Sequence, residues 1–235
     1  MRAEASRIPA ILNVLESMYG NQSPCWPTDP YDFLVWWHCG YPASDLTCVR
    51  GWESLNKEVG IEPHHILQAS MAKLARALKP GGMVPELRAQ RLLEIAARVQ
   101  DEFAGDLRAG LRGAIKEVRR ILKKFPGIND PGADRILLFA GLVPVVAIPS
   151  NCPHVIVRIQ RGQERENYGV IYREAQAEIE QGVPAKFDAR MRAYLLLKQH
   201  GQTLCKRTNP KCDQCPVNAS CAFFAKKYHG RSTSI

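Results

Sequence analysis

Apolar residues recur at helical spacing along most of the 235-residue chain. The longest example is the stretch 85–103, whose apolar residues fall on one side of a predicted helix: Leu87, Leu92, Ile95, Ala96 and Val99. Capping residues, proline and glycine separate such stretches, as Asp29-Pro30 does before residues 31–37. The same spacing predicts helices over 8–19, 46–59, 64–68, 70–78, 107–122, 168–179 and 188–200.

No stretch alternates between apolar and polar residues over the length of a strand with turn residues on both sides. Residues 143–148 are the single short candidate. We therefore predict an all-α fold of many short helices. No apolar run is long enough to span a bilayer, and the first residues lack the apolar core of a signal peptide, so we expect no membrane partner.

The charge balance suggests a polyanionic partner. With 32 basic and 23 acidic residues the chain carries a formal net charge of +9, and nucleic acid is the commonest partner of a basic protein. Four scattered cysteines, Cys25, Cys39, Cys48 and Cys152, show no spacing of a disulfide framework. A reducing compartment follows, so we expect a cytoplasmic protein, associated with the nucleoid if the source is prokaryotic.

Four further cysteines crowd into one compact loop near the C-terminus. Six, two and five residues separate them in turn: Cys205, Cys212, Cys215 and Cys221. Thiolates this close share a bond or a metal centre. Two short intervals of two to four residues each would favour a zinc ribbon, whereas the intervals here are unequal. A zinc ion with four cysteine ligands, or two disulfides, remain alternatives to an iron–sulfur cluster.

Residues 121–141 are typical of two helices joined by a tight turn. Pro126-Gly127 breaks the first helix, and Gly127 and Asn129 can take left-handed conformations. Asp130 suits the N-cap and Pro131 the first helical position, while Gly141 closes the second helix. Such a turn directs backbone N–H groups outward at a helix N-terminus, which predicts a phosphate site formed by Gly127, Ile128, Asn129, Asp130 and Gly132. An ordinary helix–turn–helix corner is the alternative.

The cysteine spacing and the hairpin together resemble the endonuclease III-like and MutY-like DNA glycosylases of the helix-hairpin-helix superfamily. In that family's Leu-Pro-Gly-Val-Gly pattern, Phe125 stands for the leucine and Asn129 for the second glycine. The resemblance implies a [4Fe-4S] cluster on the four loop cysteines. It also implies two lobes, a six-helix lobe over 29–141 and a cluster lobe of 1–28 with 142–235. Duplex DNA would cross the cleft between them, with the target base extruded.

The partner implied by the resemblance is double-stranded DNA with a damaged, mismatched or abasic site, bound by a monomer. In this family the cluster is mainly structural and supports a loop that meets DNA. Lys206, Arg207 and Lys211 would then contact phosphates. A basic loop exposed to solvent is the alternative interpretation of these three residues.

The family's two catalytic positions carry no suitable side chain here. The lysine of bifunctional members falls at Pro131, which has no amine to form a Schiff base. The family's aspartate falls at Pro149 if Asn151 matches the motif asparagine, or at Cys152 if His154 matches the motif histidine. Neither alignment supplies a carboxylate, which argues against β-lyase activity.

Another acid could support base excision. Asp45 is the first candidate, and it follows Tyr41 on the loop that faces the pocket in relatives. Tyr41, His38 and Asn151 are the candidate base-pocket residues. Asp45 could instead cap a helix, and Tyr41 and His38 could belong to the core.

We therefore expect a monofunctional DNA N-glycosylase with a non-standard acid. A catalytically inactive protein that binds lesions or abasic sites is the alternative. A redox or regulatory protein that uses the cluster is a third possibility.

Overall fold

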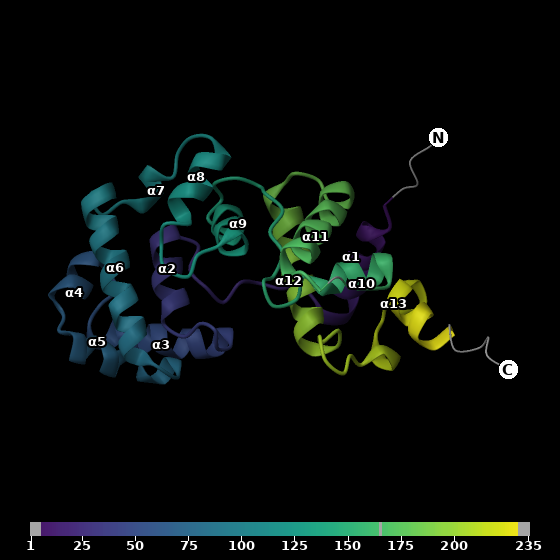
Figure 1. The fold of residues 1–235 in the computed structure, drawn as a ribbon, viewed down its shortest axis with the longest axis horizontal. Coiled ribbons are helices and arrows are strands. Elements are labelled where there is room, and N and C mark those ends of the chain that lie inside the picture. Colours follow the sequence, from purple (N-terminus) through teal and green to yellow (C-terminus); the bar gives the residue numbers. More distant parts are fainter. Residues whose placement is uncertain (1–5, 165, 230–235) are drawn as a thin grey trace. The chain divides into compact units, whose positions relative to one another are not determined.

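The computed structural model describes residues 6–164 and 166–229, and within them the chain forms two compact units. One unit is Pro24–Ile136, and the other combines Met1–Ser23 with Leu137–Ile235. The described residues contain helices and turns and no strand, and residues 143–148 form neither helix nor strand (Figure 1). The predicted all-α fold is confirmed. None of the described helices is both long and apolar enough to cross a membrane.

The unit Pro24–Ile136 is built from consecutive helices. They are α2 (Pro30–His38), α3 (Asp45–Glu58), α4 (Pro63–Gln68), α5 (Met71–Leu78), α6 (Pro85–Phe103), α7 (Leu107–Gly110) and α8 (Ile115–Leu122), followed by most of α9 (Asp130–Phe139). The predicted start of α2 is confirmed, because the Asp29 side chain accepts hydrogen bonds from the Tyr31 and Asp32 amides at 2.9 and 3.3 Å. Pro30 then occupies the first helical position, where no N–H is needed.

Two local expectations for this unit are wrong. The single helix over 107–122 is interrupted between Leu111 and Ala114, where Gly113 has a φ of 120° that a continuous helix cannot accommodate. Asp45 does not cap α3, because the Ser44 side chain accepts the Thr47 N–H and Asp45 is the first helical residue. The hydroxyl one position earlier takes the capping role.

An aromatic core surrounds a buried cation in this unit. The Arg135 guanidinium carbon lies 3.8 Å from the Trp26 ring centroid and 4.9 Å from that of Phe33. Trp36 and Trp37 lie within 5.5 Å of the same carbon. Because Arg135 sits on α9, these contacts fix the helix that follows the hairpin turn against α2. A cation on an aromatic face contributes about 2 kcal/mol when it is desolvated.

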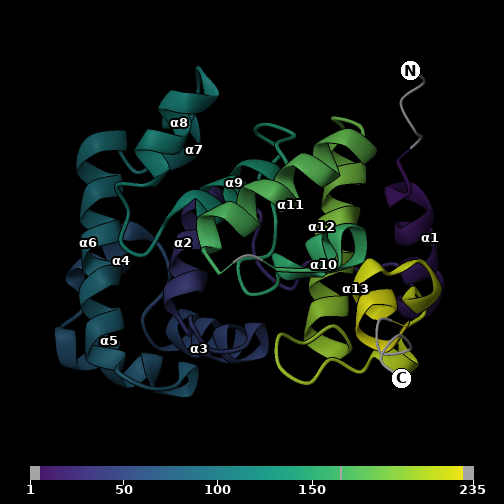
Figure 2. The ribbon, with the colours of Figure 1, turned by 45° about the vertical axis from the view of Figure 1, so that its right-hand side comes forward.

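The second unit joins the two ends of the chain. Helix α1 (Ile8–Tyr19) packs with α10 (His154–Arg161), α11 (Tyr168–Gly182) and α12 (Phe187–Thr203), and α13 (Ala222–Phe224) lies beside α10 (Figure 2). The buried face of α1 follows helical periodicity, with Ile8, Ile11, Leu12 and Leu15 turned inward. Arg192 of α12 fixes the outer edge of α1 through Glu16 at 2.8 Å and Asn13 at 2.9 Å.

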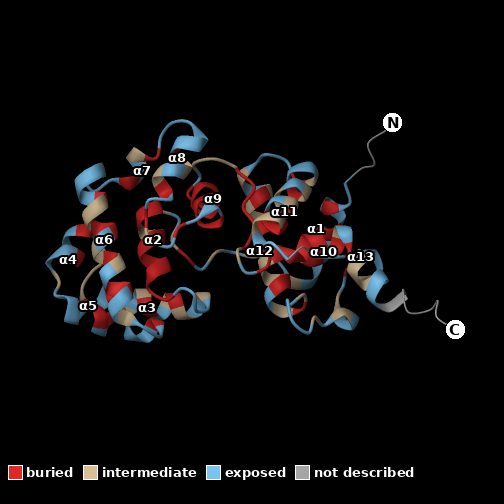
Figure 3. Ribbon diagram, in the orientation of Figure 1, coloured by how far each residue is buried: buried red, intermediate tan, exposed pale blue. Residues whose placement is uncertain are grey.

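Burial in this unit is greatest along α10, where six consecutive residues, His154 to Ile159, are buried (Figure 3). Two of them are polar side chains, His154 and Arg158. Burying such groups costs free energy unless they are bonded, so their partners indicate what the helix supports. Those partners lie in the cysteine loop.

Candidate functional site

The four loop cysteines line one cavity. It is also lined by Arg158, His200 and Phe223. Short 3-10 turns, Cys212–Gln214 and Asn218–Ser220, shape the loop. The Cys215 N–H donates to the Cys212 carbonyl at 3.1 Å, and the Cys221 N–H donates to the Asn218 carbonyl at 3.0 Å. The fold thus brings Cys205, Cys212, Cys215 and Cys221 around one space.

Burial opposes ionisation of three of the loop thiols. It raises the pKa of Cys205 to about 11, although nearby Arg158 lowers it. Burial also raises the pKa values of Cys212 and Cys215. A bound metal centre would supply the positive charge that favours the thiolate form of its ligands.

The donor set consists of thiols without a carboxylate, which suits soft metal chemistry. Within residues 6–164 and 166–229, no three His, Cys, Asp or Glu side chains converge closely enough to hold a single metal ion. A cluster of several irons places fewer demands on the ligands, because each thiolate can bind a different iron atom. Four cysteines around one cavity fit such a group.

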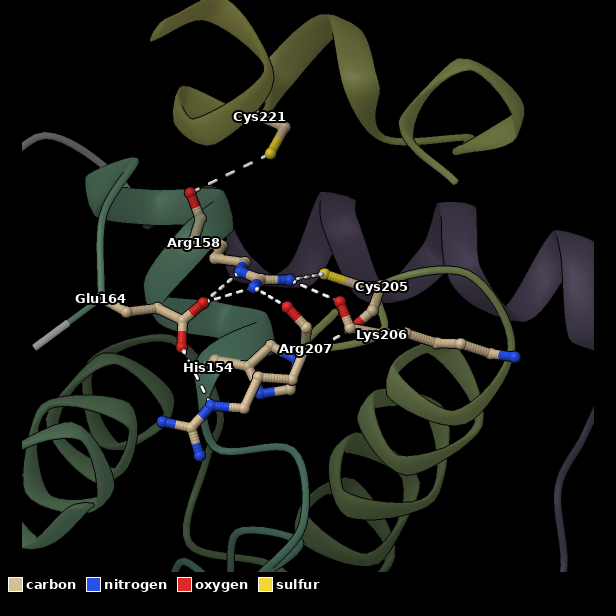
Figure 4. A network of polar contacts seen from close by, with 7 residues as sticks. All are labelled: His154, Arg158, Glu164, Cys205, Lys206, Arg207 and Cys221. Atoms are coloured by element: carbon tan, nitrogen blue, oxygen red, sulfur yellow. Dashed lines mark hydrogen bonds and ion pairs between the residues drawn. The ribbon is translucent and has the colours of Figure 1, made fainter. Parts of the chain in front are cut away.

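Arg158 ties the cysteine loop to α10 (Figure 4). Its guanidinium donates to the carbonyls of Lys206 and Arg207, both at 2.8 Å, and lies 3.8 Å from the Cys205 sulfur. Glu164 pairs with the same guanidinium and lies 3.8 Å from the Arg207 side chain. One buried cation therefore sets the path of the backbone directly after the first cysteine.

Two buried histidines also reach the loop. The Nε2 atom of His154 lies 2.8 Å from the Cys205 carbonyl, and that of His200 lies 3.6 Å from the Cys215 sulfur. The Nδ1 atom of His200 lies 2.9 Å from the Tyr19 hydroxyl. Burial lowers the pKa of both histidines, that of His200 to about 4.

The basic residues of the loop are exposed. Lys206, Arg207 and Lys211 face solvent, with their backbone fixed by Arg158 and by the hydrogen bond from the Lys211 N–H to the Leu204 carbonyl at 2.9 Å. Charges displayed on a fixed backbone suit contact with a polyanion.

The hairpin turn takes the expected shape with one difference. Gly127 has a φ of 70°, the left-handed conformation predicted for it, and the Ile128 N–H donates to the Phe125 carbonyl at 3.2 Å. Asn129 is not among the described residues with positive φ, so the expectation of two left-handed residues is wrong. Gly127 is the left-handed residue of the turn, and Ile128 directly after it is buried.

Helix α9 follows the turn directly. It begins at Asp130, one residue before the predicted position, and the Ala133 N–H donates to the Asn129 carbonyl at 2.9 Å. Gly127, Asn129 and Asp130 are exposed, while Gly132 is buried against Ile128. The exposed backbone at this helix N-terminus can receive an anion.

Acidic and basic side chains are paired beside the turn. Lys123 at the end of α8 lies 2.7 Å from Asp130, and Arg119 lies 2.7 Å from the buried Asp134. Arg119, Lys123 and Asp130 line an open groove on this side of the hairpin. The rest of its lining is Ala114, Lys116, Glu117, Arg120 and Lys124. The groove is predominantly basic.

The expected catalytic positions hold no carboxylate or amine. Pro131 is buried in the first turn of α9, and Pro149 is buried before α10. Helix α10 itself begins at His154 after Pro153, so the residue that precedes this helix also lacks a carboxylate. Cys152 is buried.

The remaining candidates lie in different surroundings. Tyr41 is 40% exposed and stacks on Trp37 with 4.0 Å between the ring centroids. Asp45 is half-buried in the first turn of α3. His38 is buried, and its Nε2 lies 2.8 Å from the Pro126 carbonyl, so this ring supports the hairpin turn. Asn151 is exposed on a turn before α10, in the other unit.

Sequence reasoning missed several residues that surround the cysteine loop. Most of them lie far from their partners in the chain: 15 positions separate His200 from Cys215, 49 separate Arg158 from Arg207, and 181 separate Tyr19 from His200. Glu164 is only 6 positions from Arg158. A polar residue inside an apolar helical run, as Arg158 is in 154–159, was the available signal.

Comparison with solved structures identifies the fold. Endonuclease III in a non-covalent complex with DNA is similar over 95% of this chain and 97% of its own, with a TM-score of 0.73 and 17% identity. This chain has the endonuclease III fold. A thermostable thymine-DNA glycosylase matches at 0.72 with 18% identity, covering 94% of this chain and 97% of its own. The resemblance to the helix-hairpin-helix glycosylase superfamily is thereby confirmed for the fold.

A third structure of this fold is more distant. The 3-methyladenine DNA glycosylase MagIII of H. pylori, bound to 1,N6-ethenoadenine, gives a TM-score of 0.59 with 18% identity, over 83% of this chain and 94% of its own. No family model matches the sequence, and no curated protein does. The endonuclease III fold is thus retained in a strongly diverged sequence.

Proposed function

We propose that the chain is a DNA N-glycosylase of base excision repair that releases a damaged or mismatched base without cleaving the strand. It would bind double-stranded DNA as a monomer. The observation that carries this proposal is the hairpin turn, with Gly127 at a φ of 70° and exposed backbone leading into α9, in a chain with the endonuclease III fold. Such a turn suits a DNA phosphate.

The absence of β-lyase activity follows from Pro131. A lyase needs a primary amine to attack the sugar and form a Schiff base, and proline at this position has none. Lys123 lies across the hairpin, where its amine is paired with Asp130 at 2.7 Å. A paired ammonium has no free electron pair for this attack.

We propose Asp45 as the acid that supports base release, with Tyr41 beside the extruded base. Asp45 is half-buried at the start of α3, and Tyr41 presents a partly exposed ring backed by Trp37. A stacked, partly exposed ring is a platform for an unstacked base. His38 supports the turn from inside, and Asn151 stays a candidate base-pocket residue.

We propose a [4Fe-4S] cluster on Cys205, Cys212, Cys215 and Cys221. Four thiols around one cavity, with the cysteine spacing of the loop, support this assignment. Bound there, the cluster would supply cross-links within the loop. The chain's own Arg158 would fix the backbone of Lys206 and Arg207 so that these residues and Lys211 meet phosphates.

A screen of lesion duplexes tests the activity. The full chain is incubated with duplexes that contain uracil, oxidised pyrimidines, 8-oxoguanine or alkylated bases, and base release is separated from strand cleavage by heating with alkali. We expect release on one class, no cleavage without alkali and no adduct trapped by borohydride. Silence on every duplex would overturn the enzyme assignment.

A matched pair of variants tests the acid. Asp45→Asn should abolish release, whereas Asp106→Asn should leave it unchanged. Asp106 begins α7 in the same unit, and its side chain accepts the Ala109 N–H at 2.9 Å, a bond that asparagine can also accept. Full activity of the Asp45 variant would remove that residue from the mechanism.

The second candidate is a protein that binds lesions or abasic sites without catalysis. The prolines at both expected catalytic positions favour it. It predicts no base release, together with salt-sensitive binding that is tighter on a damaged or abasic duplex than on intact DNA. Equal affinity for all duplexes would contradict it.

A further inference from the structure

His200 is a fully buried residue of α12 whose two ring nitrogens both have partners. Nε2 lies 3.6 Å from the Cys215 sulfur, and Nδ1 lies 2.9 Å from the Tyr19 hydroxyl. Tyr19 is the last residue of α1, so the ring joins the N-terminal helix to the cysteine loop. A buried polar ring with this placement requires an explanation beyond packing.

The partners define which nitrogen carries the proton. A cysteine that ligates a metal is a thiolate, which accepts hydrogen bonds and donates none. Nε2 must therefore carry the proton if it is to bond Cys215. Nδ1 then accepts a hydrogen bond from the Tyr19 hydroxyl. Thr203 Oγ1 lies 3.1 Å from the Tyr19 oxygen and 2.8 Å from the Gln199 carbonyl, and its single hydrogen can go to either. With Nε2 protonated, each ring nitrogen of His200 has a partner of the matching kind.

We propose that His200 is a positioning residue that donates a hydrogen bond from Nε2 to the Cys215 sulfur, and that Tyr19 fixes the tautomer required for this. The inference rests on the proposed cluster. A hydrogen bond to a ligating sulfur stabilises negative charge there, and reduction of a cluster adds negative charge. The hydrogen bond therefore raises the reduction potential of the cluster and slows the loss of its iron.

His154 provides an internal comparison. It is also buried in the same unit and reaches the same loop, but its Nε2 lies 2.8 Å from the Cys205 carbonyl, not from a sulfur. Removing this ring loosens the backbone without removing a hydrogen bond to a ligand atom. The two histidines thus separate an effect on the sulfur from a general loosening of the loop.

The experiment uses the full chain and four variants, His200→Leu, His200→Gln, Tyr19→Phe and His154→Leu. Three quantities are measured for each: iron content, the rate of iron loss to a chelator, and the midpoint potential by voltammetry. In His200→Leu we expect iron loss to accelerate by about 10–100-fold and the potential to become more negative. Tyr19→Phe should shift both in the same direction by less.

The other two variants decide the interpretation. His200→Gln should stay nearer the parent, because its amide N–H can occupy the place of Nε2. His154→Leu should lose iron faster while it keeps the parental potential. If His200→Leu does not retain iron, Tyr19→Phe and His200→Gln still give the answer.

The proposal is overturned if His200→Leu or, where that variant holds no iron, Tyr19→Phe keeps the parental potential and rate of loss. It is also overturned if His154→Leu shifts the potential equally. A parent chain without iron would overturn the cluster and this role together, before any variant is made. A parent that holds iron but releases no base would affect only the glycosylase assignment.

Discussion

The hairpin turn and the cysteine loop solve the same problem, presenting backbone at the surface, by different means. The turn is closed by bonds between near neighbours, such as Ile128 N–H to the Phe125 carbonyl, and by the positive φ of Gly127. The loop is held by Arg158, which lies 48 positions before Lys206 and 49 before Arg207. The local conformation of the turn therefore tolerates sequence changes elsewhere in the chain, whereas the path of the loop depends on the single residue Arg158.

The comparison predicts that the largest single loss of stability comes from the loop's cation. Arg158→Met would remove both carbonyl contacts and leave the largely buried Glu164 with only the exposed Arg207, at 3.8 Å. Breaking a buried pair costs about 3–5 kcal/mol of unfolding free energy. Urea unfolding of the full chain, followed by circular dichroism, measures this.

Arg161→Met is the matched control for that variant. Arg161 follows on the same helix and pairs with Glu174 at 3.1 Å and Glu178 at 2.8 Å, but its side chain is 41% exposed. Exposed pairs contribute at most about 1 kcal/mol. Equal losses from the two variants would remove the distinction between a buried and an exposed cation.

The next effect concerns the turn and depends on pH. Burial lowers the pKa of His38 to about 4, although its bond to the Pro126 carbonyl opposes the change. The unfolded chain therefore binds this proton at a higher pH than the folded chain does. Stability that is fully present above about pH 6.5 should fall by about 3 kcal/mol as the pH drops through 4.

Subtracting a variant isolates the contribution of His38. His38→Gln keeps a donor for the Pro126 carbonyl but cannot take up a proton, so its unfolding free energy should vary less between pH 6.5 and 4. The difference between parent and variant cancels the other titrating groups. Parallel pH profiles for the two proteins would refute this account of the buried ring.

A smaller effect separates the two glycines at the turn. Gly127→Ala places a side chain at a φ of 70° and should cost about 1–2 kcal/mol, with weaker duplex binding. Gly132→Ala lies inside α9, where the new methyl meets Ile128 at an ordinary 3.4 Å, and should stabilise by about 0.5–1 kcal/mol. Thermal unfolding distinguishes the signs. Stabilisation by Gly127→Ala would show that the turn does not need left-handed backbone.

The smallest effect concerns the charges that the loop displays. Lys206→Ala should reduce the slope of log affinity for duplex against log salt by about 0.9, the value for one lost phosphate contact. Arg207→Ala should change it less, because Glu164 already lies 3.8 Å from that guanidinium. Fluorescence anisotropy at several salt concentrations measures both.

Lys57→Ala is the control for this pair, since Lys57 lies in the last turn of α3, outside both the hairpin turn and the cysteine loop. It should leave the slope unchanged. If Lys206→Ala leaves the salt slope unchanged, the basic loop is a surface exposed to solvent and not a DNA contact.

The sequence alone determined what depends on neighbours along the chain. Helical periodicity, the Asp29-Pro30 start and the left-handed Gly127 could be predicted because their physical causes lie within a few residues. The same locality explains the errors. The break at Gly113 and the cap at Ser44 instead of Asp45 are choices between nearly equivalent local options.

Tertiary structure decided which polar residues surround the cysteines. Arg158, His154 and His200 lie on two helices, and Tyr19 lies on a third, from the opposite end of the chain. Nothing in their local sequence identifies their partners, because burial creates the need for a hydrogen bond and the fold alone determines which group can meet it. The cysteine spacing therefore indicated a shared centre, and only the packed helices showed what holds the loop around it.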